Sequence, residues 1–155
     1  MTFNKPFKIS NNLLAIIFLI VSFVGFLDAT YLTIEHYRGV IPPCTILAGC
    51  GNVTTSKFAL IAGVPVALLG AIYYLSIFIL SVLYLDCKKK SFLQLTAKLT
   101  IIGFLASAYF VYLQLFVIGY ICLYCMFSAA TSTLLFINGY IVFLFNKVYK
   151  TNSLL

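Results

Sequence analysis

The longest uncharged stretch of this sequence runs from Leu99 to Phe145, and it limits most strongly what the chain can fold into. As a single α-helix it would be about 70 Å long, more than twice the roughly 30 Å hydrocarbon thickness of a bilayer. The stretch must therefore fold back, and we expect the turn at Gly119. Over the whole chain 63% of the residues are hydrophobic and 8% are charged. So little polar surface excludes a water-soluble enzyme and a nucleic-acid-binding protein, and it indicates an integral membrane protein.

Two further apolar stretches raise the number of expected membrane spans to four. Leu13–Leu32 has Asp28 as its only charged residue, and Phe58–Leu85 has none. Each is long enough to cross the bilayer as a helix. The sequence therefore predicts an all-α, four-helix transmembrane bundle that forms a single membrane domain over residues 1–155. Its expected spans are residues 13–33, 62–85, 95–117 and 121–145.

The positions of the basic residues predict the orientation of the bundle. Eight of the ten Lys and Arg residues lie on one side of the expected spans: Lys5, Lys8, Lys88, Lys89, Lys90, Lys98, Lys147 and Lys150. Basic residues are enriched on the cytoplasmic side of membrane proteins. We therefore expect both termini in the cytoplasm and a large first extracytoplasmic loop over residues 34–61.

Four of the five cysteines are expected on the extracytoplasmic side, where disulfides form and persist. Cys44 and Cys50 form a C-x₅-C pair in the large loop, and Cys122 and Cys125 form a C-x₂-C pair at the outer start of the fourth span. A helix start favours the thiolate form of cysteine, and residues i and i+3 are close enough for a reversible disulfide. A thiolate of one pair can attack the disulfide of the other, so the two pairs predict a thiol relay.

Other interpretations of the cysteines stay open at this point. Two structural disulfides in a non-catalytic membrane protein would need the same four residues, and four cysteines could form a structural zinc site. The zinc site is disfavoured because such sites organise polar modules and His36 is the only histidine, so no metal is expected. Cys87, in the expected cytoplasmic loop, is interpreted as an inert free thiol.

A thiol relay needs an electron acceptor. The sequence has no G-x-G-x-x-G motif, and one histidine cannot supply two axial haem ligands, so neither flavin, nicotinamide nor haem is expected. By elimination, the remaining acceptor is a lipid-soluble quinone in the bilayer.

Several motifs together resemble the vitamin K epoxide reductase family, and bacterial members in particular. They are the four spans, the loop C-x₅-C pair, Ser56 six residues after Cys50, and the C-x₂-C that opens the fourth span. The stretches 25–33 and 63–70 match as well, and the resemblance covers residues 12 to 145. The DsbB type of protein, which has the same overall reaction, places its C-x₂-C in the first outer loop and is therefore disfavoured.

The resemblance implies a role for each site residue. Cys122 and Cys125 would be the active-site pair, with Cys125 facing the quinone, and Ser56 would offer a hydroxyl near it. Cys50 would exchange with Cys122, and Cys44 would meet an external thiol protein.

The resemblance also implies the partners and the place of the reaction. The donor would be a separate periplasmic, thioredoxin-like (DsbA-like) protein, and ubiquinone, menaquinone or a related quinone would accept the electrons. The protein would lie in the cell inner (cytoplasmic) membrane with its active site facing the periplasm. Reduction of vitamin K or its epoxide is the alternative physiological activity. Ala129 stands where the vertebrate enzymes place a tyrosine.

Asp28 is the one acidic residue within an expected span. A carboxylate in mid-membrane costs about 2.5–3.5 kcal/mol on insertion scales and less near the interface. The sequence leaves two interpretations open for Asp28: proton handling or loop anchoring, or placement at the interface. Glu35 and His36 are interpreted as interfacial.

Overall fold

Four long helices form the structure. The computed structural model describes residues 11–42 and 49–152, with side chains up to residue 145. Lys5, Lys8 and Cys44 lie outside the described residues, and the side chains of Lys147 and Lys150 lie outside the described side chains. The helices are α1 (Asn11–Arg38), α3 (Val66–Cys87), α4 (Lys90–Tyr112) with its π-helical continuation η2 (Leu113–Ile118), and α5 (Leu123–Asn152). All four are long and apolar enough to cross a membrane. The predicted all-α, four-helix bundle is confirmed.

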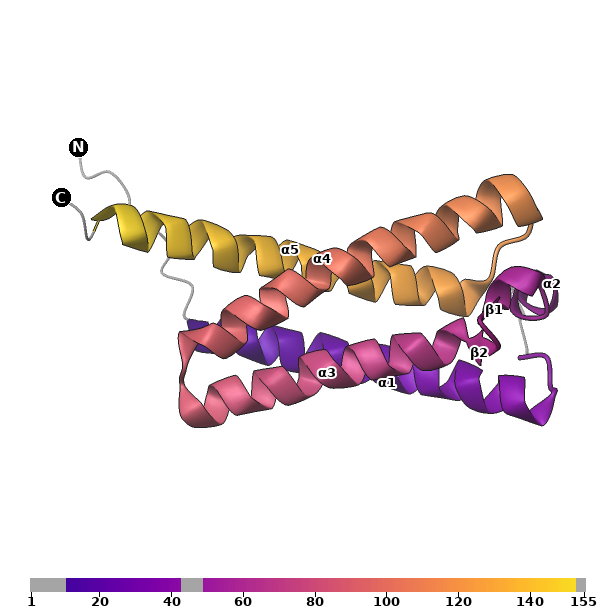
Figure 1. Cartoon of the computed structure of the whole chain (residues 1–155), viewed down its shortest axis with the longest axis horizontal. Helices are drawn as coiled ribbons and strands as arrows, with labels where there is room; N and C mark the ends of the chain where they lie inside the picture. Colours follow the sequence, from indigo (N-terminus) through magenta and orange to yellow (C-terminus); the bar gives the residue numbers. More distant parts are fainter. Residues whose placement is uncertain (1–10, 43–48, 153–155) are drawn as a thin grey trace.

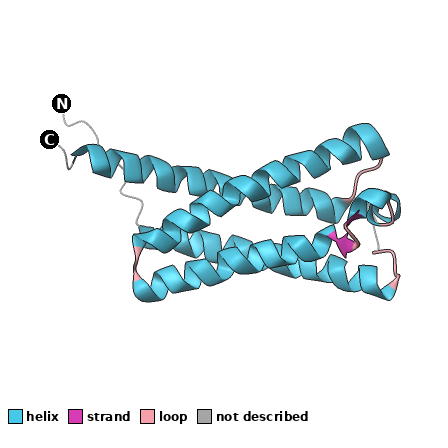
Figure 2. Cartoon of the chain, viewed as in Figure 1, coloured by secondary structure: helices cyan, strands magenta, loops and turns pink. Residues whose placement is uncertain are grey.

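The helices pack in two pairs. The most extensive contacts join α1 to α3 and α4 to α5, and α1 also packs on α5 (Figure 1). The start of α1 and the end of α5 lie at the same end of the bundle. The other end carries the short elements α2 (Cys50–Thr54), η1 (Lys57–Ala59), β1 (Leu60–Ile61) and β2 (Val64–Pro65). Strands β1 and β2 form a small hairpin, which Figure 2 shows beside the starts of α3 and α5. Its antiparallel register pairs Leu60 with Pro65 and Ile61 with Val64.

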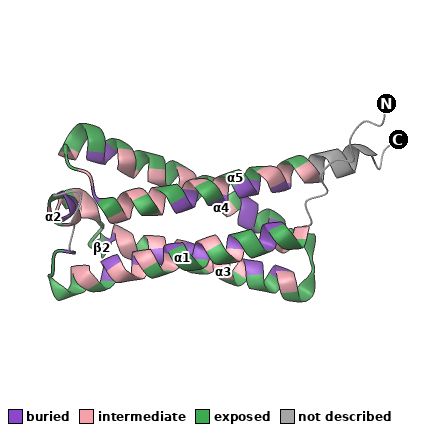
Figure 3. Cartoon of the chain, turned by 180° about the vertical axis from the view of Figure 1, so that it is seen from behind, coloured by how far each residue is buried: buried purple, intermediate pink, exposed green. Residues whose placement is uncertain are grey.

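The distribution of side chains suits a lipid environment. Large apolar side chains point outward, and those of Ile102, Leu105 and Phe116 are 64%, 61% and 74% exposed. Figure 3 shows such exposed positions along the outer faces of all four helices. Hydroxyl groups lie inside instead, where Ser81 donates to the Ile77 carbonyl at 2.7 Å and Thr100 to the Ala97 carbonyl at 2.7 Å. An apolar exterior, with most interior polar groups hydrogen-bonded to each other or to the backbone, suits a bilayer.

Buried polar contacts fix α5 against the other pair. The Tyr74 hydroxyl on α3 lies 2.8 Å from the Ser128 carbonyl oxygen and 2.8 Å from the Thr131 hydroxyl. The Asn138 amide donates to the Leu14 carbonyl of α1 at 2.9 Å. Hydrogen bonds between membrane helices are worth about 0.6 kcal/mol on average, so they specify the register of packing more than they stabilise it.

Two turns shape the end of the bundle that carries the cysteines. The expected turn lies at Gly119, which has a φ of 71° and donates its N–H to the Gln114 carbonyl at 3.0 Å. A residue with a side chain rarely adopts this left-handed conformation, so glycine suits the turn. The first helix extends beyond the expected span end at residue 33, and hydrogen bonds from Gly39 to the His36 carbonyl and from Val40 to the Glu35 carbonyl close it. Glu35 and His36 are therefore helical.

Candidate functional site

The C-x₂-C pair lies at the junction between the turn and α5. Helix α5 begins at Leu123, so Cys122 immediately precedes the helix and Cys125 lies in its first turn. The Cys122 carbonyl accepts the Met126 N–H at 3.0 Å, which starts the helical hydrogen-bond pattern. Cys122 thus occupies the N-cap position, where a side-chain acceptor can bind the free N–H groups of the first turn.

Electrostatics at this position favour the Cys122 thiolate. The thiol of Cys125 donates a hydrogen bond to Cys122, and this contact is the main cause that lowers the pKa of Cys122 to about 7. Burial opposes the shift, and the backbone N–H groups of Cys125 and Tyr124 reinforce it. A thiolate is the nucleophilic form of cysteine. Cys122 is therefore prepared for attack on a disulfide, or for departure from one, near neutral pH.

The first loop brings Cys50 to the same place. Cys50 is the first residue of α2, and it packs with Val53 and Cys122 in one buried cluster. Cys50 and Cys122 are 1% and 0% exposed. Cys50 is disulfide-bonded, whereas Cys122 and Cys125 are thiols. The structure thus brings one member of each predicted pair together, although the two are 72 residues apart in the sequence.

A close backbone approach permits this contact. A Cβ atom at Gly49 would lie 2.7 Å from the Ile121 carbonyl oxygen and 2.9 Å from the Ile121 nitrogen. Real Cβ atoms essentially never come so near to backbone atoms. Glycine at position 49 therefore lets the start of α2 lie directly on the segment that leads into Cys122.

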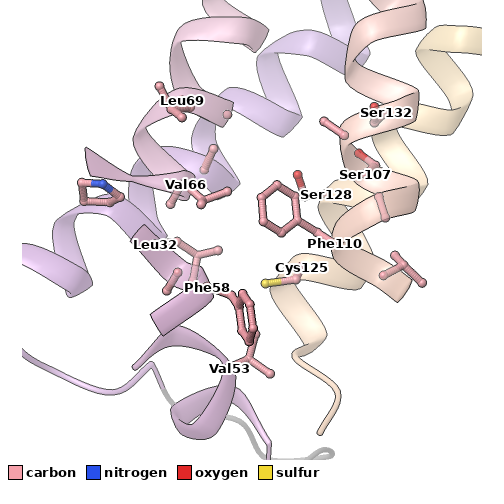
Figure 4. A pocket seen from close by; sticks show the side chains of 18 of the residues that line it. Leu32, Val53, Phe58, Val66, Leu69, Ser107, Phe110, Cys125, Ser128 and Ser132 are labelled. Atoms are coloured by element: carbon pink, nitrogen blue, oxygen red, sulfur yellow. The ribbon is translucent and has the colours of Figure 1, made fainter. Parts of the chain in front are cut away.

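Cys125 faces a different space. A cavity of about 380 Å³ lies between the four helices and the short elements, and its volume is within the range of small-molecule sites. Figure 4 shows the Cys125 sulfur directed into this cavity from α5, on the side where Phe58 and Phe110 also lie. Most of the lining is apolar, and the polar side chains that contribute are Asp28, His36, Thr54, Ser56, Tyr73, Tyr74, Ser107, Gln114, Cys125, Ser128 and Ser132.

Ser56 lines this cavity, but its hydroxyl proton is already in a hydrogen bond. Its hydroxyl donates to the Val53 carbonyl at 2.7 Å, which leaves the oxygen lone pairs toward other partners. The predicted role of Ser56 beside a ligand stays a prediction, as do the roles of the four cysteines. Among residues 11–42 and 49–152, no group of three or more His, Cys, Asp or Glu side chains could hold a metal ion.

Gln114 is a site residue that the sequence analysis missed. Its side-chain oxygen accepts the Cys122 N–H at 2.9 Å, and the residue is 3% exposed at the cavity wall. It lies in η2, and π-helical turns occur frequently at functional sites. The available signal was an amide side chain within the longest uncharged stretch. Its partner could not be identified without the tertiary structure.

Tyr124, between the two cysteines, links this region to α1. Its ring packs on that of Tyr31 with the centroids 5.4 Å apart. The first turn of α5 is thereby held from α1 as well as from η2.

The sequence of this chain matches a known protein family over most of its length. The model of the vitamin K epoxide reductase family matches residues 16–139. No curated protein matches the chain.

Removal of the Cys125 thiol is expected to raise the pKa of Cys122. In a Cys87→Ser background, Cys125→Ala deletes the main hydrogen bond to the Cys122 thiolate, so the pKa should move from about 7 toward the ordinary value of about 8.5. The thiolate is present above the pKa, so its fraction at pH 7 should fall from about one half to a few per cent. Ultraviolet absorbance of the thiolate, titrated against pH, measures this shift. An unchanged midpoint would contradict the assigned cause.

Gly49→Ala is expected to separate Cys50 from Cys122. Overpacking of this kind costs about 1–3 kcal/mol, which corresponds to at least about a fivefold loss of close contact. The measurement is the yield of the Cys50–Cys122 disulfide on mild oxidation of a chain that also carries Cys44→Ser and Cys125→Ser. Gly51→Ala is the matched control, because its Cβ would meet only the movable side chain of Ile41 at 3.1 Å. Equal yields in both variants would show that the approach at Gly49 does not place Cys50.

Proposed function

This chain belongs to the vitamin K epoxide reductase family, a family of membrane oxidoreductases that use quinones, and we propose that it is a thiol–quinone oxidoreductase supporting disulfide-bond formation. It would carry electrons from a separate periplasmic, thioredoxin-like (DsbA-like) protein to a quinone in the bilayer. The loop pair Cys44 and Cys50 would receive them, and the pair Cys122 and Cys125 would deliver them.

One observation carries this proposal: the C-x₂-C pair has two different neighbours. Cys122 packs on Cys50 in a buried cluster, whereas Cys125 faces the cavity. A structural disulfide would need neither a second cysteine beside it nor an open space in front of it. A relay needs both, because electrons must arrive from one pair and leave to an acceptor.

The exchange steps balance as ordinary thiol–disulfide chemistry. The reduced partner protein opens the Cys44–Cys50 disulfide and becomes oxidised. The Cys50 thiolate then attacks Cys122 of the Cys122–Cys125 disulfide, which forms a Cys50–Cys122 bond and releases Cys125 as a thiol. Cys44 attacks Cys50, which restores the loop disulfide and releases Cys122 as the thiolate that the hydrogen bond from the Cys125 thiol favours.

The last step passes two electrons to the quinone. In the proposed state just before quinone reduction, the loop pair is a disulfide and both Cys122 and Cys125 are reduced. Oxidation of this cysteine pair to a disulfide releases two electrons, and these together with two protons convert a quinone into a hydroquinone. The apolar cavity suits a flat quinone ring, and its position between helices gives access to lipid-soluble ligands.

The charge distribution supports a periplasmic position for this site. Lys88 and Lys89 lie between α3 and α4 and Lys90 begins α4, at the end of the bundle opposite to α2 (Figure 1). Basic residues mark the cytoplasmic side. The cysteine cluster would then face the periplasm, where a thioredoxin-like protein could reach the loop.

Cysteine variants test the function itself. Cys122→Ala or Cys125→Ala should reduce quinone reduction by dithiothreitol to the rate without protein, because the dithiol can no longer form a disulfide. Cys87→Ser is the control, since this exposed thiol is remote from the site, and it should leave the rate unchanged. The assay follows quinone absorbance with purified full-length protein and ubiquinone, menaquinone or phylloquinone in turn. Full activity in both C-x₂-C variants would overturn the proposal.

The order of exchange has its own test. In Cys125→Ala, the Cys122 thiolate can attack Cys50 of the Cys44–Cys50 disulfide, which forms a Cys50–Cys122 bond and releases Cys44. Because Cys125 is absent and cannot resolve this bond, a Cys50–Cys122 disulfide should accumulate in the oxidised protein without added reductant. Non-reducing mass spectrometry of peptides identifies the pairing. Finding the Cys44–Cys50 disulfide alone in this variant would contradict exchange through Cys50 and Cys122.

A further inference from the structure

Asp28 is a carboxylate inside the bundle that the proposed relay leaves unexplained. It lies ten residues before the end of α1, about 15 Å along the helix axis, and it lines the same cavity as Cys125. Its Oδ2 atom is buried and has no hydrogen-bond partner among the described residues. Within that part of the chain the salt bridge joins Arg38 to Glu35, at 3.9 Å, and does not include Asp28.

A structural role does not account for this placement. Buried polar atoms are nearly always hydrogen-bonded, and buried charges are nearly always paired, because an unpaired group loses its hydration without compensation. Acidic groups within membrane segments that lack such partners are usually functional. Tyr73 and Ser132 at the same cavity wall also have a hydroxyl without a partner among the described residues, and Asp28 is the one carboxylic acid among these three residues, where a ligand would meet it.

We propose that Asp28 is the proton-transfer residue for quinone reduction in this cavity. The inference rests on the proposed thiol–quinone activity and adds to it the source of a proton. Quinone reduction needs two protons in an apolar space, and the reacting Cys122 thiolate, which is about half of the Cys122 population at pH 7, has no proton to give. A second proton donor inside the cavity is therefore required besides the Cys125 thiol.

The proposed step balances in atoms and charge. The Cys122 thiolate and the Cys125 thiol form a disulfide and give two electrons to the quinone. The thiol proton of Cys125 goes to one quinone oxygen, and the carboxyl proton of Asp28 goes to the other. The products are the disulfide, the hydroquinone and the Asp28 carboxylate, which then takes up one proton from water.

The residues around Asp28 indicate from which end of α1 a proton reaches its carboxylate. Leu32 and His36 follow Asp28 at intervals of four residues on one face of α1, and both line the cavity. His36 therefore lies between Asp28 and the end of α1 that is proposed to face the periplasm. The other titratable side chains at the cavity are Tyr73 and Tyr74 on α3 and Cys125 on α5, and the lining residues from α4 have none.

The test separates the two half-reactions in the full-length protein. Asp28→Asn keeps the size of the side chain but cannot donate a carboxyl proton, and Asp28→Glu restores the donor. In a single turnover of pre-reduced protein with menadione, Asp28→Asn should slow quinone reduction about 10²-fold or more, the usual contribution of a positioned acid. Disulfide exchange with a reduced thioredoxin should stay unchanged. Asp28→Glu should recover most of the wild-type rate and the solvent deuterium isotope effect of the wild-type protein. Asp86→Asn is the matched control, because Asp86 is an exposed acid at the end of α3.

Three results would overturn the inference while leaving the proposed function intact. They are a wild-type rate of quinone reduction in Asp28→Asn, an equal loss in Asp28→Glu, and an equal slowing of disulfide exchange, which would indicate a structural role. Asp28→Ser provides a second variant if Asp28→Asn does not fold. Absence of quinone reduction in the unaltered protein would instead overturn the proposed function, and the inference with it.

Discussion

The hydrogen bond from the Cys122 N–H to the Gln114 side-chain oxygen determines how the rest of the site is arranged. It joins the start of η2 to the residue immediately before α5, and both residues are buried. An unpaired N–H in this apolar region would be costly, so Gln114 both satisfies the group and fixes where the helix begins. With the start of α5 fixed, Cys122 occupies the N-cap position and Cys125 lies one turn further, directed into the cavity.

The helix start also separates the surroundings of the two cysteines. Cys122 is enclosed by Cys50 and Val53, so a disulfide partner can reach it but bulk solvent cannot. Cys125 has the cavity in front of it and donates its thiol hydrogen bond to Cys122, which stabilises the thiolate on the side of the exchange partner. Cys122, just before α5, and Cys125, in its first turn, are thus three residues apart and face two different neighbours.

The bundle combines an apolar exterior with a small number of polar groups in its interior. Most of these groups bind each other or the backbone, as the Tyr74 hydroxyl does with Ser128 and Thr131. Their hydrogen bonds hold α3 and α5 at the spacing that encloses the cavity. Asp28 differs from them because its Oδ2 atom lacks a partner among the described residues, and it lies at the wall of that cavity. The hydroxyls of Thr30, Tyr73 and Ser132 also lack a partner among the described residues, and Asp28 is the one acid in this group.

The sequence by itself determined the four-helix architecture and the position of the C-x₂-C at a helix start. The physical reason is local: an apolar stretch in lipid must satisfy its own backbone, and a helix is the way in which one segment can do so. The turn at Gly119 followed from length alone, since the stretch from Leu99 to Phe145 is too long for one span. The tertiary structure decided that Cys50 lies against Cys122, that Gln114 holds the Cys122 N–H, and that Asp28 shares a cavity with Cys125. Each of these contacts joins residues from different elements, so it depends on how the helices pack together, which no pattern within one segment records.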